Sequence, residues 1–236
     1  QGGGELGKLA EHYAAFGKNG AYIIVGPHVC GTYHDQIVSS FDADSLPYVL
    51  QIFGGECSQQ EIDRHCALLG SCDAVIGIGG GKTLDTAKAV AYYAHLPVLI
   101  VPTAAASDAP CSRLSVLYTP QGEFDRYLFL PKNPDLVLMD LDIIAGAPVR
   151  LLRAGIADAL ATWYEADACC RAHGTTPAGG HATLSAMALA KLCRDTLLEN
   201  GEQAVADVRQ GRRTEAVDHV IEANTYMSGV GFESGG

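Results

Sequence analysis

The chain has 236 residues, of which 48% are hydrophobic and 18% charged, so it can bury a large core and is not disordered as a whole. Sixteen Lys and Arg residues against 27 Asp and Glu residues give a formal net charge of −11. This balance argues against nucleic acids and anionic membranes as partners, because both attract clustered basic residues. No apolar run is long enough to predict a membrane-spanning helix, and no signal-peptide pattern is visible. We therefore expect a cytoplasmic protein.

Residues 1–147 alternate apolar, β-like runs with helix-like segments, a pattern that is typical of an α/β domain. The runs are continuous rather than alternating, which predicts parallel strands that are covered on both faces. The predicted strands are 21–25, 48–53, 74–78, 98–101 and 136–139, and the predicted helices are 5–16, 59–69 and 83–95. Segments 114–119 and 127–130 flank a Pro-Gln-Gly turn and predict a β-hairpin beside the sheet.

The composition changes after Pro148, where Ala, Leu, Cys and Met dominate. Apolar residues recur there at helical spacing, which predicts helices over 149–172, 181–200 and 214–232. We therefore predict two domains: a nucleotide-binding α/β domain over 1–147 and an all-helical domain over 148–236, which we expect to be incomplete.

A glycine-rich turn between the third predicted strand and its helix is the most informative local feature. Gly79, Gly80 and Gly81 precede Lys82 and Thr83 at the predicted helix start. Such a turn lets a phosphate approach the backbone and meet the free N–H groups of the helix. The spacing fits neither the P-loop nor the GxGxxG fingerprint, so a pyrophosphate loop of another type and an ordinary strand-to-helix turn both remain open.

Four charged residues lie in or beside the predicted helices and loops. Asp85 complements the helix dipole, and we expect Lys88 to be a solvated or snorkelling side chain. Asp108 follows the fourth predicted strand among small residues, where it forms a turn or faces a ligand. Asp158 lies among small helical neighbours, where it is an exposed helical residue or a carboxylate that a cation compensates.

Together these residues resemble the glycerol dehydrogenases of the iron/zinc-containing alcohol dehydrogenase superfamily. The resemblance extends along the chain in the motifs GGGKTLDTAKA (79–89), SDAPCSRLSVLYTPQGEFDRYLFLPKNPDLVLMD (107–140), RLLRAGIADALATWYEA (150–166) and NTYMSGVGFESGG (224–236). It implies the dehydroquinate synthase-like, iron alcohol dehydrogenase fold and usually a homo-oligomer. Family members continue well beyond this sequence, so we expect the chain to correspond to about the first two thirds of one.

The resemblance also implies an NAD-dependent, metal-dependent oxidation of glycerol, a polyol, to dihydroxyacetone, usually with zinc. It assigns Asp108 to glycerol and Asp158 to the metal, with two His ligands expected beyond Gly236. The implied NAD-contacting residues are Gly80, Gly81, Lys82, Thr83, Asp85, Thr103, Ala104, Ala106, Ser112, Leu114 and Tyr118.

Two departures from the family pattern leave alternatives open. The first predicted strand ends in Ile24-Val25-Gly26-Pro27, without the acidic residue that often binds the ribose, so NADP competes with NAD as the cofactor. Ala104 and Ala106 stand where a bulkier apolar residue and a Ser are usual. The alternative functions are a dehydrogenase for another hydroxy compound (a 2-hydroxy acid or glycerol 1-phosphate) and a non-catalytic nucleotide-binding module. Zinc, iron and manganese all suit one Asp and two His ligands.

Overall fold

The computed structural model describes residues 1–177 and 179–235, which divide into two compact units. The α/β unit consists of Gln1–Thr103 and Arg113–Asp140, and the helical unit consists of Ala104–Ser112 and Leu141–Gly236. The helical unit therefore includes a loop, 104–112, that follows a strand of the α/β unit. The predicted domain boundary at residues 147 and 148 stays a prediction.

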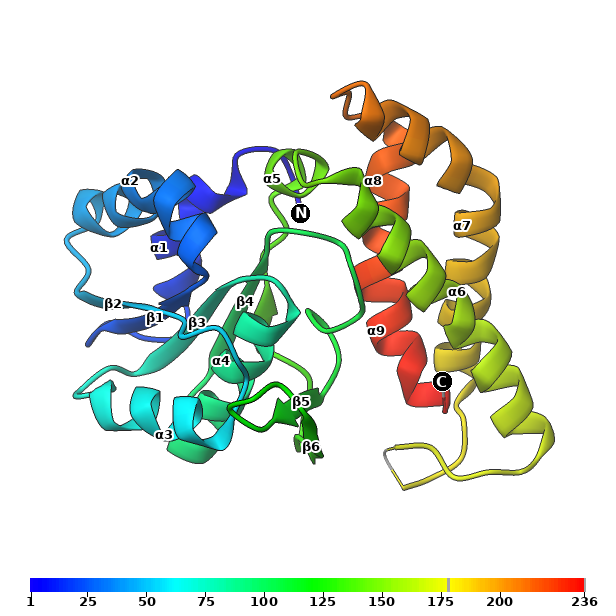
Figure 1. Ribbon diagram of the computed structural model, residues 1–236, viewed down its shortest axis with the longest axis horizontal. Helices are drawn as coiled ribbons and strands as arrows, with labels where there is room; N and C mark the ends of the chain where they lie inside the picture. The colour runs from blue at the N-terminus through cyan, green and yellow to red at the C-terminus, as the bar shows by residue number, and fades with distance from the viewer. Residues whose placement is uncertain (178, 236) are drawn as a thin grey trace. The chain divides into compact units, whose positions relative to one another are not determined.

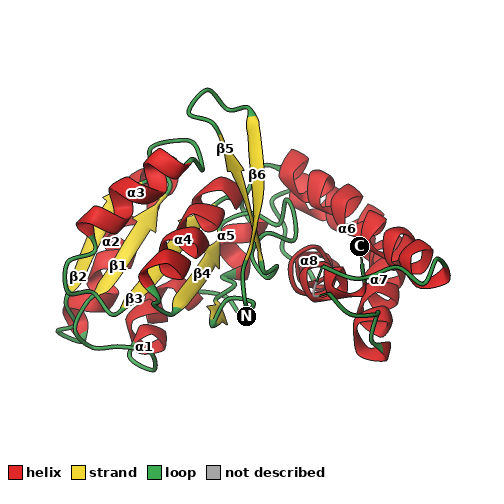
Figure 2. Cartoon of the chain, turned by 90° about the horizontal axis from the view of Figure 1, so that it is seen from below, coloured by secondary structure: helices red, strands yellow, loops and turns green. Residues whose placement is uncertain are grey.

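A parallel sheet in the order β2-β1-β3-β4-β7 forms the centre of the α/β unit (Figures 1 and 2). Its strands are β1 (Ala21–Val25), β2 (Tyr48–Ile52), β3 (Ala74–Gly79), β4 (Val98–Pro102) and β7 (Leu136–Val137). The helices that belong to it are η1 (Glu5–Lys8), α1 (Leu9–Tyr13), α2 (Pro27–Ala43), α3 (Gln59–Leu68) and α4 (Gly81–Ala94). The predicted parallel sheet and its alternation with helices are confirmed.

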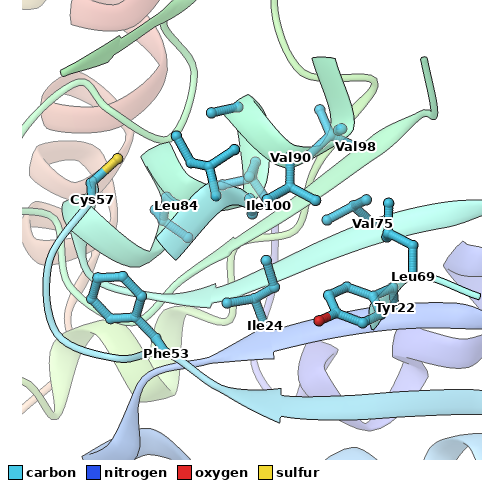
Figure 3. Close-up of a cluster of buried hydrophobic side chains, with 14 of the residues drawn as sticks. Tyr22, Ile24, Phe53, Cys57, Leu69, Val75, Leu84, Val90, Val98 and Ile100 are labelled. Carbon is cyan, nitrogen blue, oxygen red and sulfur yellow. The ribbon is translucent and has the colours of Figure 1, made fainter. Parts of the chain in front are cut away.

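Both faces of the central strands β1, β3 and β4 are buried, as their continuous apolar runs predict, whereas the edge strand β2 leaves Val49 and Ile52 exposed. Tyr22, Ile24, Val75 and Ile100 point to one face and pack with residues of α3 and α4 (Figure 3). The alternate residues of the same strands are buried as well, because successive side chains of a strand point to opposite faces. Packing on both sides therefore holds these strands in place, so the position at which each of them ends is fixed.

The hairpin consists of β5 (Leu114–Tyr118) and β6 (Phe124–Phe129), which pair in antiparallel fashion, so the predicted hairpin is confirmed (Figure 2). Helix α2 has no counterpart among the predicted helices. It begins at Pro27, which suits a first helical position because its missing N–H needs no partner there. It buries Val29, Ile37 and Phe41, which lie on one face at helical spacing.

The helical unit is formed by α5 (Leu141–Ala145), α6 (Val149–Arg171), α7 (Leu184–Arg209), α8 (Glu215–Glu222), η2 (Ala223–Met227), α9 (Ser228–Gly231) and η3 (Phe232–Ser234). Helix α7 differs from the predicted 181–200, since it begins after Thr183, whose hydroxyl accepts the Ala186 N–H at 3.2 Å. The predicted helix 214–232 is not uniform, because η2 is a π-helical segment between α8 and α9. Among the described residues, we find no helix whose length and hydropathy would let it cross a lipid bilayer.

Candidate active site

The glycine bend lies where the course of the sheet reverses. β1 and β3 are neighbours, but β1 leads outward to β2 and β3 leads to β4 on the opposite side. In open α/β sheets, ligands bind beyond the carboxyl ends of the strands at such a switch point. The bend after β3 therefore occupies the position where the fold is best suited to bind a ligand.

The glycines of the bend lie in different surroundings. Gly79 has a φ of +156°, a conformation that L side chains rarely adopt, and it lies against Thr83. Gly80 caps α4 in an extended conformation, and a Cβ built on it meets no atom within 4 Å. Gly80, Gly81 and Lys82 are exposed, whereas Thr83 is buried. The first N–H groups of a helix have no partner within the helix, so this open, positively polarised start of α4 fits a phosphate group.

Lys82 is held by two partners across the bend. Its Nζ lies 2.6 Å from Oε2 of Glu56, and it sits 5.0 Å from the centre of the Tyr118 ring. Glu56 follows the end of β2, at the same edge of the sheet, and its Oε1 also accepts the Cys57 N–H. The sequence prediction missed Glu56. Glu56 could have been found from its position after a parallel strand, because ligands of open α/β sheets bind beyond the carboxyl ends of the strands.

Asp85 is buried in a structural ion pair away from the exposed bend. It is 7% exposed, and its carboxylate lies 2.9 Å from Nζ of Lys88, which is 1% exposed. The Val116 N–H donates to Oδ2 of Asp85 at 3.1 Å, and the Leu114 carbonyl accepts a hydrogen bond from Lys88. Burial raises the pKa of Asp85, while Lys88 and the Val116 amide oppose that shift. The expectation of a solvated Lys88 is wrong, because this pair joins α4 to β5.

The other predicted cofactor residues of the α/β unit lie in the hairpin and directly after β4. Leu114 and Tyr118, the first and last residues of β5, are both half-buried. The Thr103 N–H donates to the Gly79 carbonyl at 3.1 Å, so the end of β4 is tied to the bend. Within this unit, the structure brings Gly80, Gly81, Lys82 and Tyr118 to one region.

In the helical unit, the two candidate acidic residues of the sequence meet although they are 50 positions apart. The backbone N–H of Asp108 lies 3.4 Å from Oδ2 of Asp158, a long and weak contact. Asp158 is exposed as a residue, yet burial of its carboxyl group raises its pKa, and the Asp108 N–H opposes that shift. The Asp158 residue is therefore open to solvent, while its carboxyl group is partly shielded. No cation of the described residues contributes to that shift.

The small residues around Asp158 have a packing reason. A methyl group on Gly155 would overlap the carbonyl oxygen of Ala105, so loop 104–112 lies directly on α6. Gly229 of α9 makes the second close approach, since a Cβ there would come within 2.6 Å of the Cys111 Cβ and 3.1 Å of the Asp108 carbonyl oxygen. Two glycines from two helices therefore make room for the loop that contains Asp108.

Three predicted cofactor residues belong to the same loop. Ala104 and Ala106 are half-buried, and Ser112 is buried at the end of the loop. The N–H groups of Cys111 and Ser112 both donate to the Asp108 carbonyl, at 2.9 and 3.1 Å. This turn shapes the loop after Asp108, whose backbone carbonyl accepts both hydrogen bonds, and the ligand-facing interpretation of Asp108 stays a prediction.

A complete metal site is not formed by the residues that the structure describes, 1–177 and 179–235. In this part of the chain, no group of three His, Cys, Asp or Glu residues could hold a metal ion. Asp158 fits one ligand, since it is a carboxylate with partial shielding and a raised pKa. His173 and His181 are exposed, and His181 lies 3.3 Å from the Gly174 carbonyl oxygen.

Comparison with known proteins agrees with this fold. The family model for iron-containing alcohol dehydrogenase matches residues 1–141. Because that match covers more than half of the chain, the chain belongs to the iron-containing alcohol dehydrogenase family.

Three individual proteins that the chain resembles are glycerol dehydrogenases. The chain is 54% identical over 239 residues to the glycerol dehydrogenase of Escherichia coli O6:H1, covering 100% of this chain and 65% of that protein. It is 51% identical over 240 residues to the Thermotoga maritima glycerol dehydrogenase, with the same coverage. The crystal structure of glycerol dehydrogenase from Schizosaccharomyces pombe superposes with a TM-score of 0.95 at 40% identity, covering 100% of this chain and 60% of that one. The chain thus spans less than two thirds of the length of these relatives.

Proposed function

We propose that the protein containing this chain oxidises glycerol to dihydroxyacetone by hydride transfer to NAD, with a divalent metal ion at the substrate. The observation that carries the proposal is the similarity to glycerol dehydrogenases at 51% and 54% identity along the whole chain. This similarity favours glycerol over a 2-hydroxy acid or glycerol 1-phosphate. A cytoplasmic location and assembly into homo-oligomers belong to the same proposal, and they rest on the family resemblance.

The cofactor part of the proposal is supported by the glycine bend. Gly80 leaves open space above the start of α4, and Lys82 adds a positive charge at its rim. We assign the pyrophosphate of NAD to Gly80, Gly81, Lys82 and Thr83. Asp85 acts at a distance, since its carboxylate holds the hairpin that bears Leu114 and Tyr118. Thr103, Ala104, Ala106 and Ser112 are proposed to contact the cofactor from the segment after β4.

The metal part of the proposal is supported by Asp158, which we assign as one ligand. The remaining ligands, expected to be two His residues, would come from the length of the relatives that this chain does not span. A divalent ion such as zinc, bound to an alcohol hydroxyl, acts as a Lewis acid and favours the alkoxide. Zinc is our proposal for its identity, and metal analysis of the purified protein distinguishes it from iron.

The residues of this chain have the task of orienting the substrate. We propose that Asp108 accepts a hydrogen bond from a second hydroxyl of the polyol. Its backbone N–H lies 3.4 Å from the Asp158 carboxylate, so the two acidic residues are neighbours. Orienting the reacting carbon toward the nicotinamide ring is what a protein contributes to hydride transfer.

The decisive experiment measures NADH formation by the full-length protein with glycerol, a 2-hydroxy acid and glycerol 1-phosphate, each with NAD and with NADP. The highest kcat/KM is expected for glycerol with NAD. A preference for either of the other substrates would replace glycerol in the proposal. NAD binding without turnover, in protein that contains its metal, would instead identify a non-catalytic nucleotide-binding module.

A further inference from the structure

A buried amide side chain connects the loop that bears Asp108 to the helices beneath it. Asn224 lies in the π-helical segment η2 and is 0% exposed. Its Nδ2 donates to the Ala105 carbonyl at 3.0 Å and to the Leu152 carbonyl at 3.3 Å. These contacts join segments that are 119 and 72 positions away from Asn224. One side chain therefore ties loop 104–112, α6 and η2 together, and Figure 1 shows the red C-terminal helix running beside α6.

The orientation of the Asn224 amide is fixed by its partners. Both neighbours of Nδ2 are carbonyl oxygens, which accept hydrogen bonds, so the NH2 group must face them. Oδ1 is buried and has no hydrogen-bond partner among the described residues. A buried acceptor without a partner costs about 1–3 kcal/mol. An apolar side chain would avoid that cost but would leave the Ala105 carbonyl without this donor, so the amide at this position serves the backbone of the loop.

The position of the Ala105 carbonyl determines where the rest of the loop lies. This oxygen occupies the space where a side chain on Gly155 would be, and Asn224 holds it there. Asp108 follows three residues later, with its N–H toward Asp158 and its carbonyl oxygen toward Gly229. The loop is therefore anchored at Ala105 on one side of Asp108 and packed at Cys111 on the other.

We propose that Asn224 is a positioning residue that fixes loop 104–112 on α6 and thereby places Asp108 beside Asp158. Asn224 acts through the Ala105 backbone and has no contact with the reacting atoms. The inference deepens the proposed function and rests on it to the extent that Asp108 and Asp158 serve the substrate and the metal.

The test is Asn224→Asp in the full-length protein. This change keeps the size of the side chain but sets a carboxylate oxygen against two carbonyl oxygens, so repulsion replaces attraction. Hydrogen exchange of the amides in 104–112 is expected to become about tenfold faster, because the loop loses its anchor. The KM for glycerol is expected to rise about tenfold, because Asp108 lies in the loosened loop. The KM for NAD is expected to rise less, by about two- to threefold, because Ala104, Ala106 and Ser112 of the loop are proposed cofactor contacts while the glycine bend lies on other elements.

Asn200→Asp is the matched control, because Asn200 also donates its amide to a carbonyl, that of Thr196 one helical turn earlier in α7. It should leave both the exchange of 104–112 and the glycerol KM unchanged. Asn224→Ala, which removes the donor without adding charge, is measured in the same way and should shift both quantities in the same direction.

The outcomes separate this inference from the proposed function. Unchanged exchange in 104–112 in the Asn224 variants would overturn the inference. Failure of both Asn224 variants to fold would overturn it too, since Asn224 would then support the whole unit rather than the loop. Faster exchange in a protein whose wild type does not oxidise glycerol would support the anchoring role and contradict the proposed function.

Discussion

Asp85 in α4 and Asp158 in α6 are both helical carboxylates beside a proposed binding region, yet their surroundings are opposite. Asp85 is buried and has Lys88 at 2.9 Å and the Val116 N–H at 3.1 Å. Asp158 is exposed and receives one long contact from a backbone N–H. A buried carboxylate that pairs with a cation and accepts an amide hydrogen bond already has its partners within the protein. An exposed carboxylate without a neighbouring cation can still bind an ion or a ligand. The first stabilises the fold, and the second remains the proposed metal ligand.

The largest expected effect on stability follows removal of the charge on Asp85. Asp85→Asn leaves the Lys88 ammonium buried without its carboxylate, which typically costs about 3–5 kcal/mol. The free energy of unfolding, measured with urea, should fall by that amount. Asp195→Asn is the control, because Asp195 pairs with Lys191 on an exposed helix face, where the loss of stability should be much smaller. Equal losses in the two variants would remove the contrast between a buried and an exposed pair.

Asp158→Asn should show the reverse pattern, with activity lost and stability kept. We expect kcat/KM for glycerol to fall by at least about 10²-fold, because the metal loses a proposed ligand. Burial raises the pKa of Asp158, so its ionised form destabilises the folded state above that raised pKa. When both proteins are measured free of metal, the variant should therefore unfold at the same or a higher temperature at pH 7.

That stability difference should shrink as the pH falls through the raised pKa, because the wild-type carboxyl group then becomes neutral too. Thermal unfolding of both proteins over a range of pH measures it. A clear loss of stability in metal-free Asp158→Asn at pH 7 would identify Asp158 as a structural residue like Asp85.

Gly77 in β3 and Gly80 at the start of α4 allow a comparison between a glycine that close packing requires and one that faces open space. A Cβ on Gly77 would come within 2.5 Å of the Ala87 Cβ, so Gly77→Ala should lower stability by about 1–3 kcal/mol. Gly80 faces open space, so Gly80→Ala should change stability by less than about 1 kcal/mol. It should nevertheless weaken NAD binding about tenfold, or ~1.4 kcal/mol, since the methyl group would occupy the proposed phosphate position. Calorimetry with NAD and urea unfolding test both, and unchanged affinity in Gly80→Ala would contradict the proposed pyrophosphate site.

The smallest expected effect concerns the exposed pair of Lys82 and Glu56. Glu56→Gln removes the charge that neutralises Lys82, so NAD should bind more tightly by up to about fivefold, the range of a surface ion pair. The gain should vanish at high salt, which screens exposed charges. Glu123→Gln, the same change at an exposed position of the hairpin, is the control. Weaker NAD binding in Glu56→Gln would mean that Glu56 holds Lys82 in its active position.

Local patterns in the sequence were enough to predict the sheet and the bend. Continuous apolar runs indicated the strands, because both faces of a parallel sheet are covered. Helix α2 was missed because its apolar residues Val29, Ile37 and Phe41 are widely spaced among polar and β-branched ones. The Pro27 start and that spacing together are the signal that would have found it.

The environment of charged side chains could not be predicted from local patterns. Lys88 is buried because a strand 26 residues later presents the Leu114 carbonyl, a partner that no helical periodicity reveals. The meeting of Asp108 with Asp158 and the anchoring of Ala105 by Asn224 likewise depend on contacts between distant segments. Small residues around Asp158 signalled a close approach, but not which segment approaches.

The π-helical segment η2 affects the direction in which the side chains of the following helix, α9, point. Each residue turns an α-helix by about 100°, so the wider π turn rotates α9 relative to α8. Gly229, whose Cβ would approach Cys111, follows this turn, and Asn224 lies within it. This stretch is therefore expected to tolerate a new side chain at the exposed Tyr226, whereas converting the π turn to an α turn with the number of residues unchanged would rotate Gly229 away from the loop.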